Sequence, residues 1–97
     1  MIEEFERIIQ EVCHVSFVDV SELSDKTSRR DVICARILAC YYCYKCLPDY
    51  HYVAKSIGLN NKQVYRYVMA YYQRIKTDPI LKHFDAKCQN VVDQKVL

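Results

Sequence analysis

The chain of 97 residues contains a single glycine, Gly58, and two prolines. So few turn-forming residues leave little material for the tight hairpins of a β-sheet. Apolar residues recur instead at helical spacing, first over residues 2–15 and last over residues 80–88. We therefore expect an all-α fold of five to six helices, which forms a single domain over residues 1–97.

Polar residues mark where several of these helices begin. Asp49, Asn60 and Asp78 each stand directly before a helical pattern, where a short polar side chain accepts the free backbone N–H groups of the first turn. Pro48 follows the longest pattern and ends that helix, because proline interrupts helical hydrogen bonding. The final residues, 91–97, are expected to fray.

The longest helix is expected between the polar segment 24–30 and about Cys46. Ser28 followed by Asp31 resembles a capping box at its start, and a shorter helix is expected before it, from about Asp19. Apolar residues cover most of the circumference of the long helix, which predicts a central, buried position. Arg36 is charged within this helix, and its guanidinium is expected either to reach the surface along its apolar stem or to contact phosphate.

The stretch from Tyr50 to Tyr67 has the pattern of a helix-turn-helix unit. Its first helix ends at Gly58, because glycine can adopt the positive φ of a tight turn, and Ala54 allows two helix backbones to approach closely. Helical hairpins of this kind also occur in bundles that bind nothing. The outward positions of the second helix favour nucleic acid, since they suit base edges and phosphates: Asn60, Asn61, Lys62, Gln63, Tyr65 and Arg66.

Charge is divided unevenly along the chain, although the net charge is only +2. Residues 1–25 contain seven acidic side chains and one basic, whereas residues 26–76 contain ten basic and two acidic. The basic segment includes most of the loop at 24–30 and the whole helix-turn-helix pattern. Such a concentration of positive charge is typical of a surface that binds nucleic acid.

Six cysteines raise the alternatives of a metal site or disulfides. Cys40, Cys43 and Cys46 stand three residues apart within an expected helix, but no second pair follows, and the nearest histidine, His51, lies beyond Pro48. Buried free thiols in a reducing cytoplasm account for the cysteines better. We therefore expect neither a metal nor a cofactor.

Four segments, taken in order, resemble the C-terminal DNA-binding domain of the bacterial replication initiator DnaA, a helical domain related to Trp repressor. The first leads from the opening helix to the sequence Val18-Asp19-Val20-Ser21-Glu22-Leu23. The second is the basic loop with the start of the long helix, and the third is the helix-turn-helix with Gly58 and Val64. The fourth is the closing linker and last helix. The four segments are residues 7–23, 26–36, 57–64 and 76–81. They follow one another along nearly the whole chain.

The resemblance implies binding to double-stranded DNA through two kinds of contact. The second helix of the helix-turn-helix would enter the major groove, and the basic loop would place an arginine in the adjacent minor groove. By position, Lys26, Arg29, Arg30 and Arg36 match the basic loop and the phosphate-contacting start of the long helix. The minor-groove arginine of the family aligns with Ser28, so Arg29 or Arg30 would take its place.

The family's base-reading signature is replaced here by Leu59-Asn60-Asn61-Lys62-Gln63, between Gly58 and Val64. We therefore expect a sequence preference different from the DnaA box, with Asn61 and Gln63 suited to adenine and Lys62 to guanine or phosphate. The expected DNA-binding residues are Lys26, Arg29, Arg30, Arg36, Lys55, Asn60, Asn61, Lys62, Gln63, Tyr65 and Arg66.

The expected function is that of a stand-alone, cytoplasmic relative of this domain in replication or transcription control, with a homodimer as one form. A protein–protein interaction module that regulates replication or transcription machinery is the alternative. An enzyme is not expected, because the sequence shows no nucleophile–base pairing and no phosphate-binding loop. No apolar run approaches the ~18 residues of a membrane span, and the acidic N-terminus differs from a secretory signal.

Overall fold

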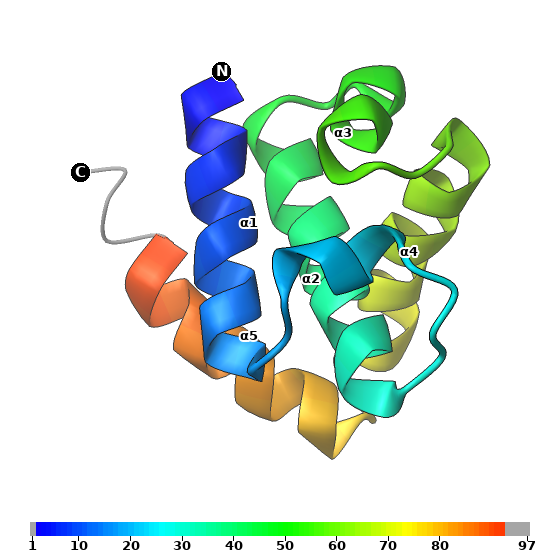
Figure 1. Ribbon diagram of the computed structural model, residues 1–97. Coiled ribbons are helices and arrows are strands. Elements are labelled where there is room, and N and C mark those ends of the chain that lie inside the picture. Colours follow the sequence, from blue (N-terminus) through cyan, green and yellow to red (C-terminus); the bar gives the residue numbers. More distant parts are fainter. Residues whose placement is uncertain (1, 93–97) are drawn as a thin grey trace.

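Five α-helices and one short 3-10 helix make up residues 2–92, the part of the chain that the computed structural model describes (Figure 1). No strand occurs in this part, so the all-α prediction is confirmed. Residues 93–97, most of the stretch where the sequence predicts fraying, lie outside the described residues. The elements are α1 (Ile2–Ser16), η1 (Val20–Ser24), α2 (Arg30–Cys46), α3 (Tyr50–Ile57), α4 (Asn61–Arg74) and α5 (Pro79–Val92).

Helix α2 is the central element, as its apolar circumference predicts. Figure 1 shows it between α1 on one side and α4 on the other, with α5 crossing below. Ten of its residues are buried, from Val32 to Cys43. A helix that is covered on most sides needs little polar surface, which explains why its sequence lacks a clear amphipathic stripe. The acidic helix α1 and the basic helix α4 are therefore kept apart by α2.

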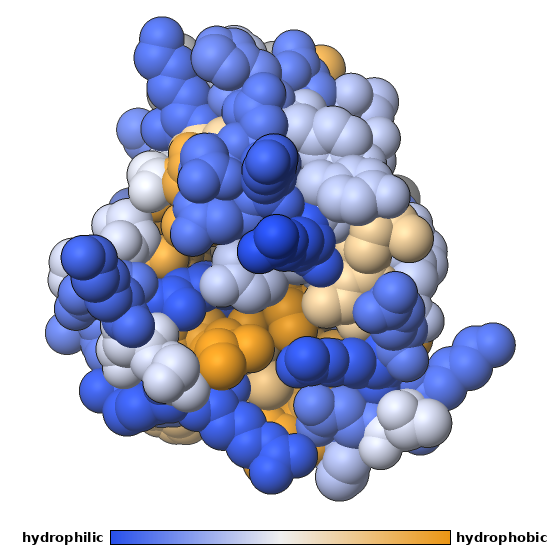
Figure 2. All heavy atoms as spheres, turned by 90° about the vertical axis from the view of Figure 1, so that its right-hand side faces the viewer, coloured by the Kyte–Doolittle hydropathy of each residue, from blue (hydrophilic) through white to orange (hydrophobic). Residues whose placement is uncertain are grey.

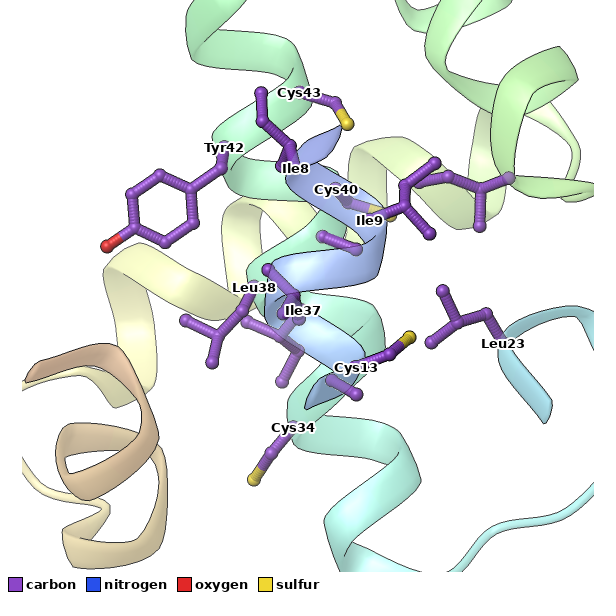
Figure 3. Close-up of a cluster of buried hydrophobic side chains, with 14 of the residues drawn as sticks. Ile8, Ile9, Cys13, Leu23, Cys34, Ile37, Leu38, Cys40, Tyr42 and Cys43 are labelled. Carbon is purple, nitrogen blue, oxygen red and sulfur yellow. The ribbon is translucent and has the colours of Figure 1, made fainter. Parts of the chain in front are cut away.

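The core joins the apolar face of α1 to α2 and to η1. Phe5, Val12 and Leu23 are fully buried, and Figure 3 shows Leu23 of η1 pointing toward Ile9 and Cys13 of α1. Burial of one such aliphatic side chain stabilises the fold by about 1.5–3 kcal/mol. Leu23 thus fixes η1, and with it the start of the following loop, against the body of the protein.

Five of the six cysteines are buried within this core, and only Cys46 is partly exposed. The thiols of Cys13 and Cys34 point in different directions in Figure 3. Burial raises the pKa of Cys13 to about 11 and that of Cys40 to about 12, because an apolar environment disfavours the thiolate. The prediction of buried free thiols is confirmed for these five residues.

The start of α2 differs from the predicted capping box. The helix begins at Arg30, and Arg29 is its N-cap without a capping side-chain hydrogen bond. The Asp31 carboxylate accepts a hydrogen bond from the backbone N–H of Val32 (2.9 Å) and forms an ion pair with Arg29. Since Asp31 is used in this way, it does not reach back to Ser28, and the prediction of a Ser28–Asp31 box is wrong.

A buried carboxylate ties three helices together. Asp85 of α5 is 5% exposed, and its oxygens accept hydrogen bonds from the hydroxyl groups of Tyr42 in α2 (2.5 Å) and Tyr71 in α4 (3.0 Å). Gln89 donates a third hydrogen bond, at 3.2 Å. Buried charge is tolerated only when it is hydrogen-bonded in this manner, so the network fixes α4 against α2 and α5.

Within residues 2–92, none of the helices is long and apolar enough to cross a lipid bilayer.

Candidate nucleic-acid interface

Helices α3 and α4 are joined by a tight turn of the kind that the sequence predicts. Asp49 caps α3 by accepting the backbone N–H of Tyr52. Gly58 ends the helix with φ +91°, and the N–H groups of Gly58 and Leu59 both donate to the carbonyl of Ala54. The positive φ requires glycine here, because a side chain would be strained in this region.

Helix α4 begins with a reciprocal pair of caps. The Asn60 side chain accepts the backbone N–H of Gln63 at 2.8 Å, and the Gln63 side chain accepts the backbone N–H of Asn60 at 3.0 Å. Both side-chain carbonyl oxygens are therefore used inside the protein. A bidentate contact with adenine needs one acceptor and one donor from the same amide. The cap holds the Gln63 amide against the backbone of Asn60, whereas the exposed Asn61 carries no such cap.

The solvent side of α4 carries a row of positive charge. Lys62 and Arg66 are exposed and four residues apart, and Arg74 follows two turns later, also exposed. Lys62 and Arg66 lie along one side of the helix, whereas Arg74 is turned about 80° further round its axis. Arg74 was not among the predicted DNA-binding residues, although the sequence shows it as the next cation along this helix.

The basic loop between η1 and α2, together with the first residue of α2, contributes a second group of positive charges. Lys26, Arg29 and Arg30 are exposed. The Arg29 guanidinium pairs with Glu22 (2.5 Å) and Asp31 (3.3 Å), while Arg30 lies 3.9 Å from a carboxylate oxygen of Asp78. Exposed pairs of this kind are worth only about 0–1 kcal/mol, so they can be exchanged for phosphate contacts at small cost.

Arg36 does not belong to this surface, contrary to both expectations for it. Its side chain is buried, at 6% exposure. The guanidinium donates to the carbonyl oxygens of Leu23 (2.9 Å) and Glu22 (3.1 Å), and to that of Asp25. These three carbonyls belong to η1 and its C-cap, so Arg36 shapes the start of the basic loop and is not free to bind phosphate.

Two observations bring the loop and α4 together. A Cβ atom added to Gly58 would lie 3.0 Å from the Cβ of Ser24, so the end of η1 packs directly against the α3–α4 turn. Arg30 lies 3.9 Å from a carboxylate oxygen of Asp78, and the backbone N–H of Asp78 donates to the carbonyl of Arg74 at 2.8 Å. The start of α2 therefore lies beside the C-terminal end of α4.

We call the combined surface the cationic face and define it as Lys26, Arg29, Arg30, Lys62, Arg66 and Arg74. Figure 2 looks onto the side of the molecule where α4 lies and shows hydrophilic side chains around an apolar floor. The residues of helix α1, with its acidic side chains, lie on the other side of α2 (Figure 1). The acidic side chains of α1 therefore do not cover the cationic face.

The remaining predicted residues lie at the surface but are not all part of this face. Lys55 is exposed on α3, on the side opposite its buried residues. Tyr65 is 51% exposed, and its ring contacts Tyr50 edge-on at 5.6 Å. Because successive helical residues are about 100° apart, Tyr65 points away from Arg66 and toward α3. We therefore separate Tyr65 from the cationic face.

Comparison of the chain with family models, with curated proteins and with solved structures found no match.

Proposed function

We propose that the chain binds double-stranded DNA, with α3 and α4 as a helix-turn-helix and α4 in the major groove. The observation that carries the proposal is the packing of Ser24 against Gly58, together with the approach of Arg30 to Asp78 at the C-terminal end of α4. This packing joins the basic loop and α4 into one surface, whose positive charge suits the negatively charged phosphate backbone of DNA. Asn61, exposed and uncapped, is the best placed residue to read a base edge.

The proposal includes a role in replication or transcription control, as a relative of the DnaA C-terminal domain. Its support is the order of the resembling segments and the helical fold. The sequence from Leu59 to Gln63 departs from the family signature, so the preferred site would differ from the DnaA box. A cytoplasmic location belongs to the same proposal, since five buried thiols suit a reducing compartment. The function is one of binding, and the proposal contains no catalytic step.

The salt dependence of DNA affinity tests the cationic face. We expect the double variant R29A/R30A to bind random duplex DNA more weakly, and to reduce the slope of log K against log salt by about 2, because each phosphate contact contributes about 0.9. The measurement is fluorescence anisotropy of a labelled duplex at several salt concentrations. A variant with the same loss of charge, K82A/K87A, removes two exposed lysines of α5 and should keep the slope of the parent protein.

Equal slopes for the two double variants would contradict the assignment of the basic loop. Selection of bound sequences from random duplexes tests base reading separately. We expect the Asn61→Ala variant to lose preference at one or two positions, while the Lys62→Ala variant weakens binding to all sequences.

A protein–protein module remains the second candidate because of one exposed aromatic ring. Phe17 is 84% exposed and adopts φ +57°, and Val20 beside it is 49% exposed. The left-handed conformation of a non-glycine residue costs about 1–2 kcal/mol. An exposed ring gains no packing energy within the chain to offset this cost. If a stoichiometric protein partner bound the parent chain but not the Phe17→Ser variant, and no duplex bound at low salt, this candidate would replace DNA binding.

A further inference from the structure

A second surface on α4 is aromatic and lies beside the cationic face. Tyr65 and Tyr72 are 51% and 59% exposed, and Met69 between them is 36% exposed. The three residues are four and three positions apart, so they form one stripe along the helix. We call this stripe the tyrosine platform. Tyr65 contacts Tyr50 of α3 and Tyr72 contacts Tyr41 of α2, whereas Arg74, two positions after Tyr72, lies on the opposite flank of α4.

Each exposed ring of the platform is held by a pair of stacked tyrosines beneath it. Tyr72 contacts Tyr41 and Tyr71 edge-on, both at 5.7 Å, and these two rings stack at 3.6 Å with an interplanar angle of 9°. Tyr71 is in turn fixed by its hydrogen bond to the buried Asp85. The ring of Tyr72 is therefore held in position before any ligand arrives.

Tyr65 is supported in the same way at the other end of the stripe. Its ring meets Tyr50 edge-on, and Tyr50 stacks on Tyr44 at 4.5 Å. A hydrogen bond with Tyr44 raises the pKa of Tyr50 to about 12. Two exposed rings on rigid supports lose little side-chain entropy on binding, so stacking on them is favourable.

Several positive charges lie near the platform. Lys45 lies 5.9 Å from the centre of the Tyr41 ring, and Lys62 and Arg66 stand on the adjacent side of α4. Asp31 and Asp49, the two acidic residues between positions 26 and 76, both accept backbone N–H groups at helix starts. Aromatic faces with nearby cations and few free carboxylates suit nucleobases joined by phosphates.

The size of the platform argues against a second protein copy as its occupant. A fully exposed tyrosine offers about 150–250 Å², so the stripe exposes on the order of 300 Å². A stable protein interface needs about 800 Å² from each partner. A single strand needs no such area, because stacking on each ring contributes independently.

On the premise that the cationic face binds a duplex, we propose that the tyrosine platform stacks unpaired bases of a DNA single strand that continues from that duplex. The two rings are seven residues apart, or about 10 Å along the helix axis. This distance corresponds to roughly three nucleotide steps of ~3.4 Å. The preferred DNA would then be a duplex with a single-stranded extension, and not a fully paired one.

The test compares a blunt duplex with the same duplex carrying a six-nucleotide thymine extension. Affinities are measured by anisotropy at one salt concentration for the parent chain and for the Tyr72→Ser variant. The Tyr72→Phe variant is the matched control, because it keeps the ring and removes only the hydroxyl group. Thermal denaturation of each variant confirms folding, which the exposure of Tyr72 should leave intact.

We expect the parent chain and Tyr72→Phe to bind the extended duplex about tenfold more tightly than the blunt one, within the range of stacking on a single aromatic ring. Tyr72→Ser should lose most of this preference and keep its affinity for the blunt duplex. Two results would contradict base stacking on the platform but not duplex binding. In the first, the parent chain binds the blunt duplex as tightly as the extended one; in the second, Tyr72→Ser keeps the preference for the extension.

Two further outcomes separate the platform from the proposed function. Failure of all DNA probes to bind overturns both. If single strands bind in a Tyr72-dependent manner while the blunt duplex does not, the platform is supported and duplex binding is overturned. Sedimentation of the free chain completes the test, because a dimer that Tyr72→Ser dissociates would assign the stripe to a second copy and overturn its role in DNA binding.

Discussion

Arg36 shows how one buried cation can control a surface that it does not join. Its guanidinium satisfies the carbonyls of Glu22, Leu23 and Asp25, which end η1 before the basic loop. The sequence offered two roles for an isolated arginine in an apolar helix, and both led to the surface. Neither applied, because no pattern in a sequence shows where unpaired carbonyls from a neighbouring element will lie.

Replacing Arg36 by methionine should therefore destabilise the fold. The variant keeps the apolar stem but leaves buried carbonyls without donors, at a cost of about 2–4 kcal/mol in the free energy of unfolding. Urea denaturation measures the change. Arg30→Met, which removes an exposed guanidinium, is the control and should stay within about 0.5 kcal/mol of the parent. Equal stabilities would mean that the carbonyls find other partners.

At the scale of elements, the sequence predicts helix starts well where the cap is a local interaction. Asp49 and Asn60 each accept the N–H group three residues ahead, and the structure confirms both caps. The predicted Ser28–Asp31 capping box does not form, because the Asp31 carboxylate binds Arg29 and the backbone N–H of Val32 instead. Helix α4 ends at Arg74, where no proline or glycine marks the end.

The start of α4 allows folding and DNA binding to be separated. Asn60→Ala should lower the free energy of unfolding by about 0.5–2 kcal/mol, because the N–H of Gln63 loses its acceptor. Asn60→Asp keeps an acceptor and places negative charge at the positive end of the helix dipole, so stability should be retained. DNA affinity should nevertheless fall for Asn60→Asp, since the new charge repels phosphate. Thermal denaturation measures the stability of each variant, and fluorescence anisotropy measures its affinity for DNA.

That prediction has a clear contrary result. If Asn60→Asp bound DNA as tightly as the parent protein at low salt, the N-terminus of α4 would not approach a phosphate backbone, and the proposed orientation of this helix would be wrong.

At the scale of the molecule, the buried thiols make stability depend on alkaline pH. Burial raises the pKa of Cys13 to about 11 and those of Cys40 and Cys88 to about 12, from an ordinary value of 9.0. Above pH 9 the unfolded chain releases these protons while the folded chain keeps them. Stability is therefore fully present below pH 9 and is lost as the pH rises toward 11 or 12.

The melting temperature between pH 7 and 11 should accordingly stay level at first and then fall above pH 9. Each thiol contributes at most about 1.36 kcal/mol per pH unit to the slope. Cys13→Ala should melt at a lower temperature at neutral pH but show a shallower decline. A melting temperature that is constant to pH 11 would contradict the burial of these thiols.

The joining of the basic loop to α4 is the part of the site that the sequence could not predict. Both groups of charge are visible in the sequence, and so is Arg74, but their adjacency depends on how η1 packs. Leu23 enters the core and Ser24 meets Gly58, and each contact links residues that are far apart along the chain. Local patterns identify the components, whereas tertiary packing decides which of them share a face.

A Cβ atom added to Gly58 would lie only 3.0 Å from the Cβ of Ser24, so the end of η1 packs tightly against the turn that leads into α4. If the basic loop and α4 both engage one duplex, the span from major to minor groove is dictated by the protein, and the DNA must adapt to it. Sequences whose minor groove is naturally narrow or easily compressed at that span would then be chosen without any base being touched there.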